Sequence, residues 1–75
     1  MKKLGLIAGS GNLPVEVLNY CNSNNIDLFV VVLEGFGDKT RYKNCVELGF
    51  GQVGKAIDFF KKNCVNDIVF AGSVK

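Results

Sequence analysis

The chain contains no histidine, one proline and three cysteines among its 75 residues. Without histidine, neither a Ser/His/Asp nor a Cys/His catalytic set can form, and a mixed Cys/His zinc site is excluded. Cys21, Cys45 and Cys64 are widely and unequally spaced, with no Cys-x-x-Cys pair. This spacing favours reduced, half-buried thiols over a metal site or a disulfide framework.

Long apolar runs and basic clusters are also missing. No stretch approaches the roughly 20 apolar residues of a membrane span, and the run after Met1-Lys2-Lys3 is too short for a signal-peptide core. We therefore expect a cytoplasmic protein. The net charge is only +2 and the basic residues alternate with acids, a pattern typical of a solvated charged face rather than a nucleic-acid footprint.

What the chain does contain is apolar residues and glycine. The hydrophobic content of 48% is typical of a packed globular protein, and nine glycines with one proline predict many tight turns. Seventy-five residues make one small domain, residues 1–75, of modest stability.

The first half of the chain predicts a β-α-β unit. Continuous apolar runs over 4–8 and 26–33 are typical of strands buried on both faces. Between them, the asparagine-rich segment 22–25 ends a helix. One face of that helix carries the apolar residues Pro14, Val17, Leu18 and Cys21.

The second half continues the alternation. We expect a loop over 34–44, a short strand over 45–48, a helix, and a strand over 67–71 before the final residues 72–75. The apolar face of this second helix is predicted to consist of Val53, Ala56, Ile57, Phe60 and Cys64. The fold class is therefore α/β, a small Rossmann-like three-layer domain with a mostly parallel four-stranded sheet in the order β-α-β-β-α-β.

A glycine turn follows the first strand directly, with the sequence Gly9-Ser10-Gly11-Asn12-Leu13-Pro14. Glycine lets a backbone approach a phosphate closely, and Pro14 is tolerated in a first helical turn because its missing N–H would be unpaired there. The context favours nucleotide or diphosphate binding by residues 9–12, and a merely tight turn is the alternative.

Ligands of parallel sheets bind beyond the carboxyl ends of the strands, and every such end here carries glycine. Glu34 follows the second strand, where an acid meets ribose hydroxyls in dinucleotide-binding domains; a solvated loop carboxylate is the alternative reading. The candidate substrate-binding residues are Gly9, Ser10, Gly11, Asn12, Glu34, Gly35, Gln52, Gly72 and Ser73.

A literal G-x-G-x-x-G spans Gly49 to Gly54, but the acid expected about 20 residues later is absent. We interpret this motif as a tight turn in which Gly54 permits close packing of helix on sheet. Glu34 and Asp38 match no specific metal pattern, and nothing in the chain supplies a nucleophile or a general base. We assign no catalytic residue and no metal ligand.

Four ordered segments carry a family resemblance: Leu6 to Pro14, Val32 to Phe36, Leu48 to Lys55, and Phe70 to Lys75. In order and spacing they resemble the amino-terminal domain of UDP-2,3-diacylglucosamine pyrophosphatases of the LpxI type. The resemblance implies a Mg²⁺-dependent hydrolase of lipid A biosynthesis that produces lipid X and UMP. It also implies a larger carboxyl-terminal domain that holds the catalytic aspartate and the metal, and this chain stops before that domain.

The resemblance predicts that this chain is the substrate-binding portion of such an enzyme and is catalytically inactive alone. Its expected partners are UDP-diacylglucosamine or lipid X as ligand, the carboxyl-terminal domain or a separate chain supplying it, and further copies of itself. The lipid substrate would bring it to the inner membrane. The alternatives are a free-standing module that binds a nucleotide such as NAD, or a non-catalytic interaction domain or gene remnant.

Overall fold

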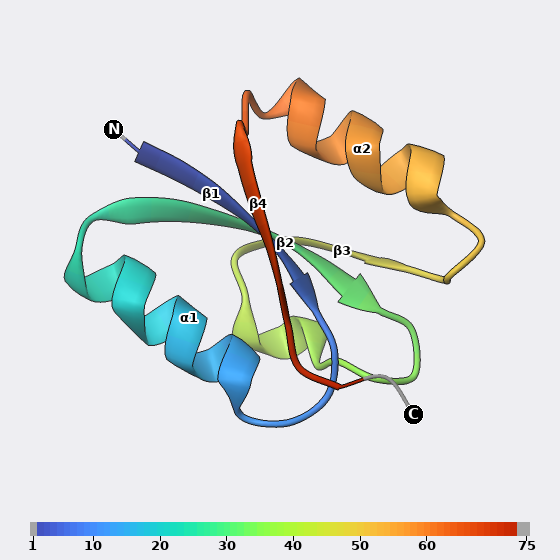
Figure 1. The fold of residues 1–75 in the computed structure, drawn as a ribbon, viewed down its shortest axis with the longest axis horizontal. Helices are drawn as coiled ribbons and strands as arrows, with labels where there is room; N and C mark the ends of the chain where they lie inside the picture. Colours follow the sequence, from blue (N-terminus) through green and yellow to red (C-terminus); the bar gives the residue numbers. More distant parts are fainter. Residues whose placement is uncertain (1, 74–75) are drawn as a thin grey trace.

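A computed structural model describes residues 2–73 and shows strands alternating with helices (Figure 1). The elements are β1 (Lys2–Ala8), α1 (Leu13–Ser23), β2 (Ile26–Leu33), the short 3₁₀ helix η1 (Lys39–Arg41), β3 (Asn44–Leu48), α2 (Val53–Lys62) and β4 (Asp67–Ala71). The strands form a four-stranded sheet in the order β3-β2-β1-β4, and each neighbouring pair is parallel. The predicted α/β Rossmann-like class is confirmed.

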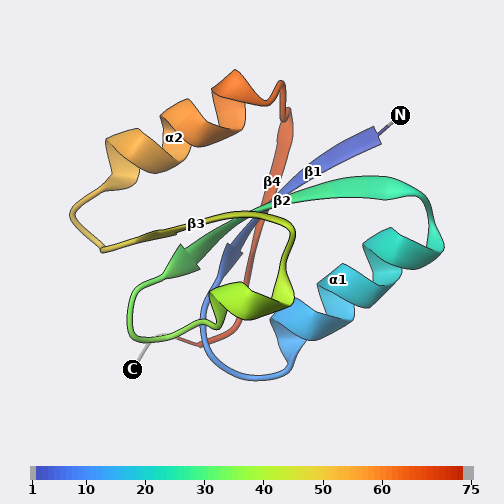
Figure 2. The same cartoon turned by 180° about the vertical axis from the view of Figure 1, so that it is seen from behind.

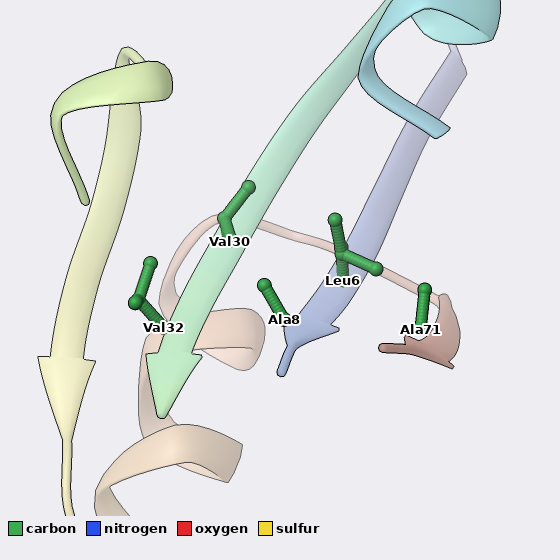
Figure 3. Packing of buried hydrophobic residues seen from close by; sticks show 5 residues of the cluster. All are labelled: Leu6, Ala8, Val30, Val32 and Ala71. Carbon is green, nitrogen blue, oxygen red and sulfur yellow. The ribbon is translucent and has the colours of Figure 1, made fainter. Parts of the chain in front are cut away.

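The two faces of the sheet are covered by different segments. Helix α1 and η1 lie on one face, and α2 lies on the other (Figures 1 and 2). Successive side chains of a strand point to opposite faces, so the apolar runs of β1 and β2 supply both layers of the core. On the α1 face, Val17 packs against a buried cluster (Figure 3) made of Leu6, Ala8, Val30, Val32 and Ala71.

The core on the α2 face is built from Phe29, Val31, Phe60 and Val65. Here Gly5 permits close approach, because a Cβ on Gly5 would lie only 2.8 Å from the Phe60 ring. Gly54, by contrast, has open space around its Cβ position. The interpretation that Gly54 permits close helix packing is therefore wrong, and Gly5 has that role.

The ends of several elements differ from the sequence prediction. Helix α2 ends at Lys62, and Cys64 lies beyond it with a φ of 59° and an exposed side chain. Its predicted place on the apolar face of the helix is wrong. Cys21 is buried and Cys45 half-buried, and all three thiols are free. Val74 and Lys75, the end of the fourth motif, lie outside the described residues.

The predicted loop over 34–44 contains η1, a short helix that was not predicted from the sequence. The Asp38 carboxylate begins this turn by accepting a hydrogen bond from the Thr40 amide at 3.0 Å. The residues after β2 are therefore folded back onto the sheet. No helix in the described part of the chain is long and apolar enough to cross a membrane.

Candidate functional site

All four strands end at one edge of the sheet because they are parallel. The turn 9–12, the pair Glu34 and Gly35, the turn 49–52, and the pair Gly72 and Ser73 follow these ends directly. The structure thus brings the sequence-predicted residues to a common edge. It does not bring them to a common pocket, because Gly9, Ser10 and Gly11 line a hollow on one face of the sheet and Gln52 lines a hollow on the other.

The loops after β1 and β4 are joined by backbone hydrogen bonds, which we call the Ser10–Ser73 bridge. The Ser10 and Ser73 amides donate to each other's carbonyls at 3.0 and 2.9 Å, and the Gly9 amide donates to Ala71. The Ser10 hydroxyl also donates to the Ser73 carbonyl at 2.9 Å. The Gly9 and Ser10 amides are therefore already paired inside the protein.

Gly9 and Gly72 are required by this bridge. A Cβ on Gly72 would lie 2.7 Å from the Gly9 carbonyl carbon and the Ser10 carbonyl oxygen, and Gly72 has a φ of +104°. A Cβ on Gly9 would lie 2.8 Å from the Ser73 carbonyl oxygen. Backbone atoms cannot move aside as a flexible side chain can, so these two glycines let the two loops touch.

The rest of the glycine turn faces outward. Gly11 has a φ of +101° with open space at its Cβ position, and Asn12 begins α1 without a side-chain capping bond. Within residues 2–73, the Gly11, Asn12 and Leu13 amides donate no backbone or side-chain hydrogen bond. These amides stand at the positive end of the helix dipole, the arrangement that binds phosphate oxygens in many proteins.

Beside this turn lies a hollow of about 180 Å³ on the α1 face, which we call the polar hollow. Gly37 brings the loop after β2 against the end of β1, because its Cβ position lies only 3.1 Å from the Ala8 carbonyl oxygen. The polar hollow is lined by Gly9, Ser10, Gly11, Pro14, Phe36, Gly37, Asp38, Arg41 and Tyr42.

Among the residues that line the polar hollow, Arg41 and Tyr42 carry side-chain hydrogen-bond donors, and both also line a neighbouring hollow. The Arg41 side chain is 47% exposed and its Nε lies 3.5 Å from the Asp38 carboxylate. The hydrogen bond from the Thr40 hydroxyl lowers the pKa of Asp38, with the Arg41 charge adding to the effect. Burial raises the pKa of the Tyr42 hydroxyl.

Arg41 and Tyr42 are not among the residues predicted from the sequence, because the charges of the loop are typical of a solvated face. The signal that could have found Arg41 is the Asp38-Lys39-Thr40 segment, which is typical of a turn that folds onto itself through an Asp side chain. Such a turn places the next side chains back beside the sheet rather than in solvent.

Glu34 and Gly35 lie beside the polar hollow but do not line it. Glu34 is exposed, and its amide donates to the Leu48 carbonyl at 2.9 Å. Gly35 has a φ of +84°, and it turns the chain so that the Phe36 amide reaches the Leu33 carbonyl at 2.9 Å. Their part in ligand binding stays a prediction.

Gln52 lies on the other side of the sheet. Its Oε1 accepts a hydrogen bond from the Gly49 amide at 2.8 Å, which closes the turn before α2. Both residues line a second hollow of about 180 Å³, the apolar hollow, with Ile7, Val31, Leu33, Leu48, Phe50, Val53, Ala56 and Phe70. The sheet therefore separates Gln52 from the glycine turn.

Metal-binding side chains do not gather anywhere in residues 2–73: no group of three or more His, Cys, Asp or Glu could hold an ion there. Asp38 is the one carboxylate lining the polar hollow, and it already accepts hydrogen bonds from Thr40. The site as described offers donors for an anion rather than ligands for a cation.

Comparison with known proteins places these features in a family. A family model described as the LpxI N-terminal domain matches residues 3–75. The chain is also similar to the UDP-2,3-diacylglucosamine pyrophosphatase LpxI of Caulobacter vibrioides, with 37% identity over 76 residues. That match covers 99% of this chain and 27% of the relative. The chain thus spans only a small part of the curated relative that it matches.

Proposed function

Because the chain belongs to the LpxI N-terminal domain family, we propose that it is the substrate-binding portion of a UDP-2,3-diacylglucosamine pyrophosphatase. Such an enzyme hydrolyses the diphosphate to lipid X and UMP in lipid A biosynthesis. The family match over residues 3–75 carries this proposal. The polar hollow supports it, because it combines the open Gly11 amide with a cation at the edge where sheets of this kind bind ligands.

In this proposal the Gly11, Asn12 and Leu13 amides bind the oxygens of the diphosphate. Arg41 lines the polar hollow together with Gly11, and its guanidinium can donate two parallel hydrogen bonds to a phosphate. Its ion pair with Asp38 is half-exposed, and such pairs contribute little to stability. A phosphate can therefore replace Asp38 as the partner of Arg41 at small cost.

The residues present do not fit a magnesium site. Mg²⁺ prefers an octahedral set of oxygens that includes one or two carboxylates, and the carboxylate of the polar hollow is held by Thr40 and Arg41. We propose that the Mg²⁺ and the catalytic aspartate belong to a carboxyl-terminal domain, in the same polypeptide or a separate chain. The isolated chain then binds ligand without hydrolysing it.

The remaining proposals follow from the substrate. A UDP-linked lipid would bring the protein from the cytoplasm to the inner membrane surface, and copies of the chain could associate there. The alternatives, a free-standing NAD-binding module and a non-catalytic interaction domain or remnant, predict different ligands. A direct binding experiment separates them.

The binding experiment records amide chemical shifts of the 75-residue chain during separate titrations with UDP, lipid X and NAD. We expect saturable shifts with UDP at Gly11, Asn12 and Leu13, together with the Arg41 side-chain signals. Saturation by NAD alone would favour the alternative module. No shift with any of the three would contradict a binding role for the polar hollow.

The Arg41→Ala variant tests how much the Arg41 charge contributes to UDP affinity. A hydrogen bond to a charged group contributes about 1.5 kcal/mol, so UDP affinity should fall about tenfold. Lys39→Ala is the matched control, because Lys39 shares η1 but its Nζ lies 4.0 Å from Glu47 and away from the polar hollow. Equal losses in both variants would show that general charge, rather than Arg41, drives binding.

A hydrolysis assay tests whether the 75-residue chain is catalytically inactive. The purified chain is incubated with UDP-2,3-diacylglucosamine and Mg²⁺, and UMP release is measured against the buffer rate. We expect no release above buffer. Robust release would show that the chain itself supplies the catalytic groups.

A further inference from the structure

The α1 face carries a second hollow because the connection between two of its strands is short. Parallel strands are usually joined by a crossover that contains an α-helix, but the chain between β2 and β3 forms only the three-residue η1. Figure 2 shows η1 and α1 on one face of the sheet. Residues of α1, β2 and η1 enclose a hollow of about 260 Å³ there, and its lining includes Asn22, Leu28, Val30, Arg41, Tyr42 and Asn44. We call it the asparagine hollow.

The asparagine hollow continues the polar hollow, because Arg41 and Tyr42 line both. The Tyr42 side chain packs against the buried cluster of the α1 face, and the Cys45 thiol of β3 donates to the Lys39 carbonyl at 3.3 Å. The boundary between the two hollows is therefore held by the sheet. Small-molecule sites measure about 300–1,000 Å³, a range that the two hollows reach together and neither reaches alone.

The lining of the asparagine hollow combines an apolar floor with free amide side chains. Leu28 and Val30 contribute the floor from β2. Asn22 belongs to α1 and Asn44 begins β3, and within residues 2–73 neither side-chain amide makes a hydrogen bond. Apolar surface with a few unpaired polar groups around it is typical of a small-molecule site.

A nucleobase has the chemistry that such a lining recognises. Its flat ring can cover the apolar floor, and its edge carries both hydrogen-bond donors and acceptors. The amide side chain of asparagine also carries both. The acylated sugar of the proposed substrate fits less well, because its acyl chains need apolar walls, whereas Asp27 and Lys43 also line this hollow.

We propose, resting on the function proposed above, that the asparagine hollow binds the uracil base of UDP while the diphosphate lies in the polar hollow. Asn22 and Asn44 donate to and accept from the edge of the base. Arg41, which lines both hollows, contacts the phosphates. The substrate then lies on the domain in one direction, with its nucleoside toward η1 and β3 and its acylated sugar on the Gly11 side.

The test separates the base from the diphosphate. Chemical shifts of the 75-residue chain are recorded during separate titrations with UDP, with inorganic pyrophosphate and with lipid X. We expect UDP and pyrophosphate to shift the Gly11 amide signal, because both carry a diphosphate. Only UDP should shift the side-chain amide signals of Asn22 and Asn44.

Alanine variants measure the contribution of each asparagine. Asn22→Ala and Asn44→Ala should each weaken UDP binding about fivefold, the value of one hydrogen bond between neutral groups, and leave pyrophosphate binding unchanged. Asn19→Ala is the matched control, because Asn19 is also an exposed residue of α1 but lines neither hollow. It should bind UDP as the wild type does.

Three outcomes overturn the assignment of the base and leave the proposed function standing. UDP could bind at Gly11 without moving either asparagine signal, the asparagine variants could weaken UDP and pyrophosphate equally, or lipid X rather than UDP could shift Asn22 and Asn44. A chain that binds neither UDP nor pyrophosphate would instead contradict the binding role of the polar hollow, and the base assignment with it.

Discussion

Substituting alanine at two glycines separates the Ser10–Ser73 bridge from simple backbone strain. Gly11 and Gly72 have nearly the same φ, +101° and +104°, but only Gly72 has backbone atoms within 3 Å of its Cβ position. An L-residue in this region costs about 1–3 kcal/mol. Gly11→Ala should show this strain alone, whereas Gly72→Ala should also separate the two loops.

The extra cost of Gly72→Ala comes from hydrogen bonds. The bridge contains two amide–carbonyl bonds between Ser10 and Ser73 and one from the Ser10 hydroxyl, each contributing about 1 kcal/mol. Gly72→Ala should therefore lower the free energy of unfolding by about 2–3 kcal/mol more than Gly11→Ala. A domain of this size has a total stability on the order of 5 kcal/mol, so Gly72→Ala should be close to unfolding.

Urea denaturation followed by far-ultraviolet circular dichroism measures this difference. Small domains lose about 1 kcal/mol per molar urea, so the two midpoints should differ by about 2–3 M. Ser10→Ala, which removes only the hydroxyl bond, gives a milder variant with an expected loss of about 1 kcal/mol. Losses for Gly72→Ala and Gly11→Ala that agree within about 0.5 kcal/mol would refute the structural role of the bridge.

Two further predictions concern titratable side chains. The lowered pKa of Asp38 means that its carboxylate adds stability above its unfolded-state pKa, and this contribution is lost as pH falls through the lowered folded-state pKa. Urea midpoints between about pH 5 and pH 2 should therefore fall less steeply in Asp38→Asn than in the wild type. Identical profiles would contradict the Thr40 hydrogen bond. Burial raises the pKa of the Cys21 thiol, whereas Cys64 is exposed. An aromatic disulfide reagent should therefore modify Cys64 first and Cys21 last. Rapid labelling of Cys21 in the folded chain would show that α1 opens readily from the sheet.

Much of the fold could be predicted from the sequence because its strands form from continuous apolar runs. The segment 26–33 is rich in β-branched residues, and it forms β2 with the predicted bounds. The glycine turn after β1 separates a strand pattern from a helical one, so the β-α-β unit is plain. Cys64 was misplaced because its spacing continues the helical period, whereas the backbone leaves the helix at Asn63.

Less of the candidate site could be predicted, because sequence spacing gives the edge of a sheet but not the face. Gly11 and Gln52 both follow strand ends, yet they line hollows on opposite faces. Arg41 reaches the polar hollow only because Gly37 lets its loop pack on Val32 and Ala8, a contact between segments far apart in sequence. The exposure of β4 likewise follows from its position at the end of the strand order, which its apolar sequence does not reveal.

The Ser10–Ser73 bridge ties the glycine turn to the last residue described, on the route by which the chain leaves the sheet. Tension applied to the polypeptide downstream of Ser73 acts first on those hydrogen bonds and reaches β1 only after they break. A neighbouring domain that shifts while tethered there would thus pull on the glycine turn before it pulls on β1. Ser10 both holds the end of the chain through these hydrogen bonds and lines the polar hollow.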